Sequence, residues 1–179
     1  MYRSLSFDRQ ASKWFGRNIR NTQRWDYAEL GEKMKCLSLW NPWASVIFEH
    51  DDAGRMVKPD ETRCWWTSVR GRIAIHAAKY QIKDDERRHY ESLLLSLGLR
   101  WRELPFGSII GTVELTHCIS APVIAKDRED WQLVWGDYRA VGDDGKARYA
   151  FVLRDPIRLP KPIPWKGRQG FFNVPDDLF

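Results

Sequence analysis

The sequence has few cysteines and no long apolar run. Its three cysteines, Cys36, Cys64 and Cys118, are far apart, a spacing that fits neither a disulfide framework nor a CxxC metal knuckle, so we expect buried thiols. No apolar stretch approaches the roughly 18 residues that cross a bilayer, and the N-terminus lacks the apolar core of a secretory signal. These absences argue against a membrane protein and predict a cytoplasmic one.

Several catalytic signatures are also missing. The sequence contains no HExxH, no GxSxG, no phosphate-binding glycine loop and no cluster of metal-ligand residues. We therefore expect neither a cofactor nor a metal ion.

The composition is that of a globular protein, with 43% hydrophobic and 30% charged residues. A net charge of +5 and a pI near 9.2 favour nucleic acid over acidic protein as a partner. The ten tryptophans are unusual, and several stand beside Lys or Arg. Rings interleaved with cations suit base stacking and phosphate neutralisation, although each single Trp is more often a core residue.

The chain divides into a polar, basic arm and one compact domain. Residues 1–33 show no sustained apolar period and form the expected arm, with a short helix near 25–30, and residues 34–179 form the domain. Alternating or apolar segments predict strands at 35–40, 61–66, 70–79, 105–120 and 148–160, with a last one in the region 164–174. Helical spacing predicts a short helix after Asn41, one over 81–97 that ends at Gly98, and a short piece at 130–135.

Strands therefore outnumber helices, and the helices are inserted before the second strand and after the third. This pattern predicts an α+β fold, a small mixed β-barrel of about five to six strands with short flanking helices, and not a βαβ repeat.

The stretch KPDETRCWW, residues 58–66, carries the strongest candidate site. On a strand, Glu61, Arg63 and Trp65 share one face, which offers an acceptor, a planar cation and a stacking surface. Such a trio can hold an unpaired base, with Trp65 under the ring. The alternative is an internal ion pair between Glu61 and Arg63 beside a core Trp.

The segments LSLWNPWASVIF, KPDETRCWWTSVRGRIAIHAAK, GSIIGTVELTHC and YAFVLRDPIRLPKPIPWKGRQGFFNV occur in an order that resembles the ASCH domain, named for homology to the activating signal cointegrator. The resemblance covers residues 34–174. It implies a PUA-like β-barrel whose cleft is built from the first helix, the loop after it and the ExRxW strand, and relatives are thought to bind RNA or other nucleic acids. The family's motif residues match Lys58, Glu61, Arg63 and Trp65, and its RG-IHA strand matches Arg70, Gly71, Ile75, His76 and Ala77.

Two features depart from the family pattern. The loop before Lys58 is longer than the usual turn, long enough to act as a mobile flap, and the N-terminal arm has no family counterpart. An amidohydrolase type of relative has the pattern K-x-x-T-x-R, in which Lys58 and Arg63 match. Glu61 occupies the threonine position, and this departure counts against amidohydrolase chemistry.

Further residues are candidates for the same cleft. Lys58 suits a phosphate contact or is a solvated loop lysine, and Asn41 and Trp43 open a helix whose N-terminus can attract an anion, unless Asn41 is a plain cap. His76 and Lys79 end a strand that leads to the cleft. Lys166, Arg168 and Gln169 extend the basic surface or form an exposed polar turn.

The sequence thus predicts a nucleic-acid-binding domain, with RNA as the expected ligand, whose site residues are Lys58, Glu61, Arg63, Trp65, Asn41, Trp43, Arg70, His76 and Lys79. One alternative is a metal-independent RNA-processing hydrolase that uses Lys58, Glu61 and His76 as acid and base. The other is a protein-interaction adaptor in which the tryptophans and the arm meet a partner protein. The preferred base and the oligomeric state are left open.

Overall fold

The computed structural model describes residues 33–179, so the predicted arm, apart from Lys33, and the predicted helix at 25–30 lie outside the described residues. The strands are β1 (Lys33–Leu39), β2 (Asp60–Arg63), β3 (Gly71–Ala77), β4 (Ser108–Ser120), β5 (Tyr149–Pro164) and β6 (Phe171–Pro175). The α-helices are α1 (Trp43–Val46), α2 (Asp84–Ser96), α3 (Ala121–Ile124) and α4 (Asp130–Leu133). Short 3-10 helices are η2 (Trp101–Glu103), η3 (Ala125–Asp127) and η4 (Asp176–Leu178).

The six strands form one mixed sheet in the order β2-β5-β4-β3-β1-β6. Neighbours β1 and β3 are parallel and the other pairs are antiparallel. Strands β2 and β6 end this order, and within residues 33–179 no pairing joins them to close the sheet. The predicted α+β class, with six strands and short helices, is confirmed.

The alternation predicted for two strands is confirmed and places the core on both sides of the sheet. Leu37 and Leu39 of β1 join Ile73 and Ile75 of β3 in the largest apolar cluster, which α1 covers. Cys36 and Ala74 lie in a second cluster with Phe172, on the opposite face. Because β1 and β3 are parallel and in register, Ser38 is paired with His76 on that second face.

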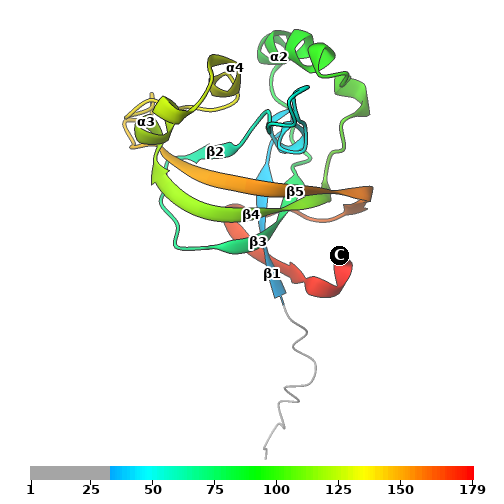
Figure 1. Ribbon diagram of the computed structural model, residues 1–179. Coiled ribbons are helices and arrows are strands. Elements are labelled where there is room, and N and C mark those ends of the chain that lie inside the picture. The colour runs from blue at the N-terminus through cyan, green and yellow to red at the C-terminus, as the bar shows by residue number, and fades with distance from the viewer. Residues whose placement is uncertain (1–32) are drawn as a thin grey trace, which may run out of the picture. The chain divides into compact units, whose positions relative to one another are not determined.

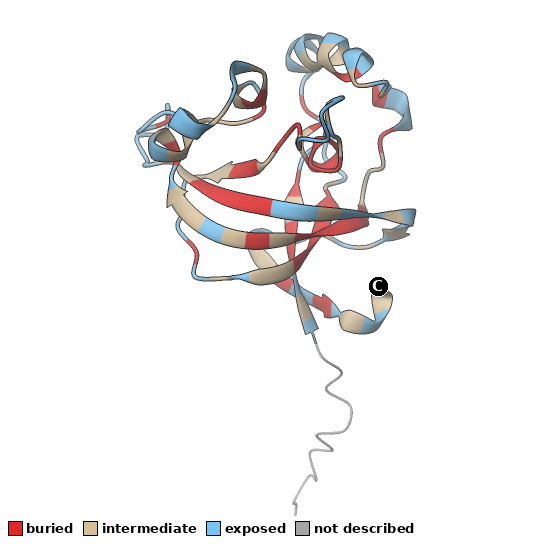
Figure 2. Ribbon diagram, viewed as in Figure 1, coloured by how far each residue is buried: buried red, intermediate tan, exposed pale blue. Residues whose placement is uncertain are grey.

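Figure 1 shows α2, α3 and α4 above the long β4 and β5 ribbons and the C-terminal residues below them. Figure 2 shows that burial concentrates along the strands and around α1, whereas α2 is largely exposed. A third apolar cluster, with Val46, Leu94 and Trp135 among its members, lies under α2. No helix in the described part of the chain is long and apolar enough to span a membrane.

Three expectations need correction. The strand predicted over 61–66 is only β2, Asp60–Arg63, since pairing with β5 ends at Arg63, so the residues after it leave the strand. Cys64, just after β2, is exposed, Cys118 in β4 is half-buried, and only Cys36 is a buried thiol. Burial raises the pKa of the Cys36 thiol to about 12, which leaves it protonated and unreactive at neutral pH.

Candidate functional site

A cleft of about 1080 Å³ opens where β1 and β3 end, beside β2 and the loop that follows β5. Parallel neighbours end at the same edge of a sheet, so the residues that follow them are brought together there. The lining residues come from five segments: Ser38, Leu39, Trp40 and Trp43; Glu61, Arg63 and Trp65; His76, Ala78 and Lys79; Gly107; and 164–170. Six of the nine predicted site residues therefore line one cleft: Trp43, Glu61, Arg63, Trp65, His76 and Lys79.

Glu61 lies between two cations. Its Oε2 is 2.8 Å from Nζ of Lys58 and its Oε1 is 3.0 Å from Nε of Arg63. The Lys58 side chain is only 1% exposed and also donates to the backbone oxygen of Asp60. Both expectations for Lys58, a phosphate contact and a solvated loop lysine, are therefore wrong, because its ammonium is buried and needs the carboxylate of Glu61 as its partner.

Arg63 points from β2 toward the end of β1, where its Nη2 donates to the carbonyl oxygen of Ser38 at 2.8 Å. Its Nε lies within 3.0 Å of Glu61 but is buried without a hydrogen-bond partner. The contact with Glu61 is thus ionic, because the N–H is not directed at the carboxylate oxygen. Since 28% of the side chain stays exposed, the guanidinium keeps donors on the cleft side.

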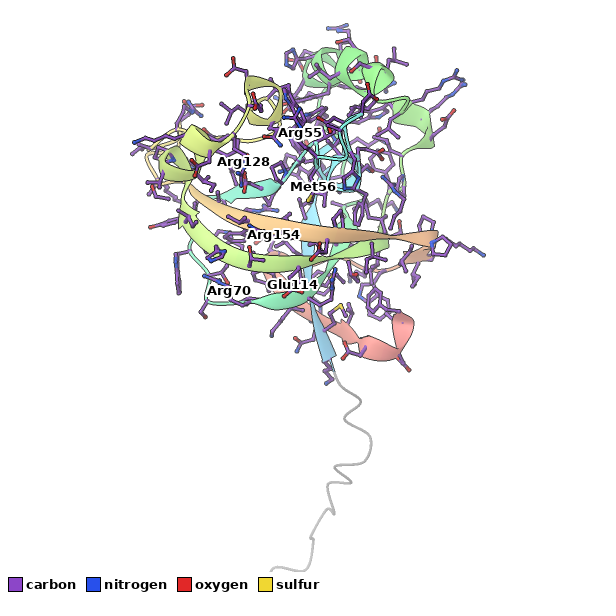
Figure 3. All side chains as sticks on the ribbon, in the orientation of Figure 1. Arg55, Met56, Arg70, Glu114, Arg128 and Arg154 are labelled. Carbon is purple, nitrogen blue, oxygen red and sulfur yellow. The ribbon has the colours of Figure 1, made fainter. Side chains whose placement is uncertain are left out.

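An ion pair between Asp60 of β2 and Arg128 fixes the β2 strand. Asp60 is fully buried and accepts from Nε of Arg128 at 2.6 Å and from Nη2 at 2.8 Å. Tyr138 donates its hydroxyl to the same carboxylate, and burial together with this charge raises the pKa of Tyr138. Figure 3 shows Arg128 beside β2. The bidentate pair fixes the strand that carries Glu61 and Arg63.

Trp65 belongs both to the cleft wall and to the core. Its ring meets Phe151 edge to face at 4.9 Å and Phe171 at 5.6 Å. It packs against the largest apolar cluster and is half-buried. The two interpretations of this residue are therefore compatible, because aromatic neighbours hold the ring at one edge while the remainder lines the cleft.

His76 connects β1, β3 and the loop after β5. Its Nε2 lies 3.0 Å from the carbonyl oxygen of Trp165, and its Nδ1 lies 3.0 Å from Oγ of Ser38. A carbonyl only accepts, so Nε2 carries the proton and Nδ1 of the neutral ring accepts from the serine hydroxyl. Burial lowers the pKa of His76, which keeps the ring neutral at pH 7.

Gly167 lies directly over this pair of side chains. A Cβ at this position would be 2.4 Å from Cε1 of His76 and 2.8 Å from Oγ of Ser38. Only glycine allows the backbone to approach so closely. The loop from Trp165 to Gly170 is thereby seated against the floor of the cleft.

The loop 165–170 forms one wall of the cleft. Lys166, Arg168 and Gln169 line the cleft and are exposed, so the cleft carries four cations, Arg63, Lys79, Lys166 and Arg168, against the one carboxylate of Glu61. Ser38, Trp40 and Trp165 were missed as lining residues. The signal for Trp165 was present in the sequence, since it stands directly before Lys166.

Two of the remaining predicted residues have structural roles. Asn41 is fully buried, accepts from the hydroxyl of Ser45 at 2.8 Å and donates to the carbonyl oxygen of Pro105. It makes no capping bond to the four-residue helix α1, so neither its capping nor its anion-binding role is found. Arg70 donates to the carbonyl oxygens of Thr67 and Val69 in the loop before β3 and does not line the cleft.

A smaller cavity of about 270 Å³ adjoins the cleft through Trp43 and Glu61, which line both. Its other walls are Thr62, Tyr90, Trp135, Gly136 and Asp137. Within residues 33–179 no group of three or more His, Cys, Asp or Glu side chains is placed to hold a metal ion.

No protein-family model matches the chain. The sequence is 25% identical over 143 residues to activating signal cointegrator 1 of Mus musculus and of Homo sapiens, which is 78% of this chain. The matched region is 22% of those proteins, so the chain spans about a fifth of their length.

Among solved structures, the chain is similar to ASCH from Zymomonas mobilis, at 18% identity and a TM-score of 0.49 over 81% of this chain and 90% of that one. A tyrosine-to-phenylalanine mutant of that protein gives 19% identity and a TM-score of 0.40, over 74% and 76% of the two chains. The homology to activating signal cointegrator 1 agrees with the motifs found in the sequence, and together they support an ASCH domain in this chain.

Proposed function

We propose that this protein binds single-stranded RNA in the cleft at the ends of β1 and β3. The observation that carries the proposal is the lining itself, in which four tryptophans, Trp40, Trp43, Trp65 and Trp165, are combined with four cations. Aromatic faces stack unpaired bases, and Lys and Arg neutralise the phosphates between them. The ASCH homology supports the same ligand class, because relatives are thought to bind RNA.

Each wall of the cleft has a role in this proposal. Trp65 stacks on a base, and Arg63, which Glu61 and the carbonyl oxygen of Ser38 hold in place, donates to a phosphate or to a base carbonyl. Lys166 and Arg168 are exposed on the loop 165–170. In this proposal they contact the phosphates of the bound RNA. Glu61 already faces two cations, so its main task is to position Arg63.

Fluorescence anisotropy of labelled single-stranded RNA tests the proposal when it is measured at several salt concentrations. Each phosphate contact contributes about 0.7 to the slope of log affinity against log salt for a single strand. Lys166→Gln and Arg168→Gln should each weaken binding and lower that slope by about this amount. No salt-dependent binding by the unaltered protein would refute the proposal.

Matched controls are available away from the cleft. Lys126 in η3 and Arg154 in β5, the latter labelled in Figure 3, are exposed and line neither cavity. Lys126→Gln and Arg154→Gln remove the same charges as the two cleft variants. Equal losses in all four variants would show that affinity follows net charge and not this cleft.

The structure leaves the hydrolase alternative with fewer candidate acid and base residues than the sequence suggested. Of Lys58, Glu61 and His76, only Glu61 and His76 line the cleft, and both nitrogens of His76 are already hydrogen-bonded. The anisotropy samples, run afterwards on a denaturing gel, decide this point. Shortened RNA that His76→Gln leaves intact would establish cleavage.

The adaptor alternative predicts another outcome. Protein contacts release far fewer counterions than phosphate contacts do, so a salt-insensitive complex with a protein and no RNA binding would favour it. The cytoplasmic location and the domain boundary near residue 34 also belong to the proposal.

A further inference from the structure

Two exposed aromatic side chains stand together at the mouth of the cleft. Trp40 is 49% exposed and Tyr80 is 53% exposed, and their ring centroids are 4.6 Å apart with an interplanar angle of 39°. Single exposed aromatics are common on protein surfaces, but a contacting pair beside a cationic cleft is not explained by the core.

The backbone holds this pair in place. Trp40 directly follows β1 and Tyr80 comes three residues after β3, at the shared end of these parallel strands. The amide of Ala78 donates to the carbonyl oxygen of Leu39 at 2.8 Å, which extends the contact between the strands beyond their last paired residues. The carbonyl oxygen of Trp40 accepts from the amide of Ala44 in α1 at 3.0 Å. The two rings are thus presented on fixed backbone.

The pair continues the lining of the cleft. Trp40 itself lines the cleft, as does Lys79, whereas Tyr80 does not. The exposed Lys79 thus shares the cleft lining with Trp40 and directly precedes Tyr80 in the sequence. The cleft volume of about 1080 Å³ lies at the upper end of the roughly 300–1,000 Å³ range of ligand pockets, so the cleft has room for more than a lone nucleoside.

We infer that Trp40 and Tyr80 form a second stacking platform, which takes the base next to the one in the cleft, with Lys79 on the phosphate between the two. The inference rests on the proposed function and narrows its ligand to single-stranded RNA of at least two nucleotides with both bases unstacked. A duplex keeps its bases stacked and presents none to such a platform. A free nucleoside reaches only one of the two surfaces.

The test uses Tyr80 because it lies outside the cleft lining. Tyr80→Leu keeps an apolar side chain but removes the ring, and Tyr80→Phe keeps the ring without the hydroxyl. Anisotropy with a labelled ten-nucleotide single-stranded RNA should show a loss of about 5- to 150-fold for Tyr80→Leu, the range expected for one stacked base, and wild-type affinity for Tyr80→Phe. Trp66→Leu is the control, since Trp66 is 56% exposed and lines neither cavity.

The outcomes separate the two claims. If the unaltered protein binds RNA and Tyr80→Leu binds equally well, the platform is refuted while the proposed function stands. The same holds if Trp66→Leu loses as much as Tyr80→Leu, because the effect is then not local. If the unaltered protein binds no RNA at any salt concentration, both claims fail. Contact of Trp40 and Tyr80 with a protein partner is then the remaining alternative.

Discussion

Nε2 of His76 donates a hydrogen bond to the carbonyl oxygen of Trp165 across 3.0 Å, and thereby ties the last loop of the cleft to the central strand β3. The same ring accepts from Ser38 on β1. One neutral imidazole thus joins three segments that are distant in the sequence. Protonation of Nδ1 would remove its ability to accept from Ser38.

The first prediction concerns pH. The pKa of His76 is lowered below 6.5 in the folded protein, so the unfolded chain takes up this proton first as pH falls. The stabilisation is therefore complete above about pH 6.5 and is lost as pH drops through that value toward the lowered folded pKa. Melting temperatures at pH 7.5 and pH 5.5 measure the loss.

His76→Gln is the matched variant for this measurement. Glutamine can donate to Trp165 and accept from Ser38, as the neutral histidine does, but it does not titrate. The other three histidines, His50, His89 and His117, are present in both proteins. The variant should lose less stability between the two pH values, and an identical loss would assign the effect to other groups.

The second prediction concerns the buried pair of Lys58 and Glu61. Lys58→Met leaves the carboxylate with Arg63 as its remaining charged partner, and we expect a loss of about 3–5 kcal/mol in the free energy of unfolding. In the double variant Lys58→Met, Glu61→Gln the carboxylate that Lys58 neutralised is also gone, so its loss should be smaller than the sum of the two single losses. Urea unfolding of the unaltered protein, the two single variants and the double variant gives the coupling free energy between Lys58 and Glu61. Strictly additive losses would contradict the prediction.

The third prediction separates the two roles of Trp65. Trp65→Ala removes packing against Phe151 and Phe171, with a cost near or below the lower end of the about 3–5 kcal/mol for buried Trp, because the residue is half-buried. Trp65→Leu retains part of this packing but has no aromatic face. If the ring stacks on a base, Trp65→Leu should melt nearer to the unaltered protein yet bind RNA more weakly; unchanged affinity would leave only the core role.

The fourth prediction concerns Gly167. In Gly167→Ala the new methyl group cannot fit at 2.4 Å from His76 and 2.8 Å from Ser38, so the loop must move outward. We expect a stability loss of about 1–3 kcal/mol, as for other overpacked sites. RNA affinity should fall as well, because Lys166 and Arg168 move with the loop. Normal affinity at unchanged stability would show that the loop tolerates the shift.

The sequence alone determined most of the strands and the faces of β1 and β3, although β2 is shorter than predicted. The alternation around Leu37 and Ile75 predicted which side chains point to the core, because a strand places successive residues on opposite faces. The ordered motifs pointed to the ASCH domain, and six of the nine predicted site residues do line one cleft.

Only the tertiary structure decided which charges face the cleft. Lys58 and Arg168 look alike in the sequence, yet Lys58 is buried against Glu61 and Arg168 lies exposed on the cleft wall. The pairing of distant side chains depends on how strands and loops meet, as for Ser38, His76 and Gly167, and no local pattern encodes it. Local spacing therefore predicted the elements, whereas long-range packing selected the working residues.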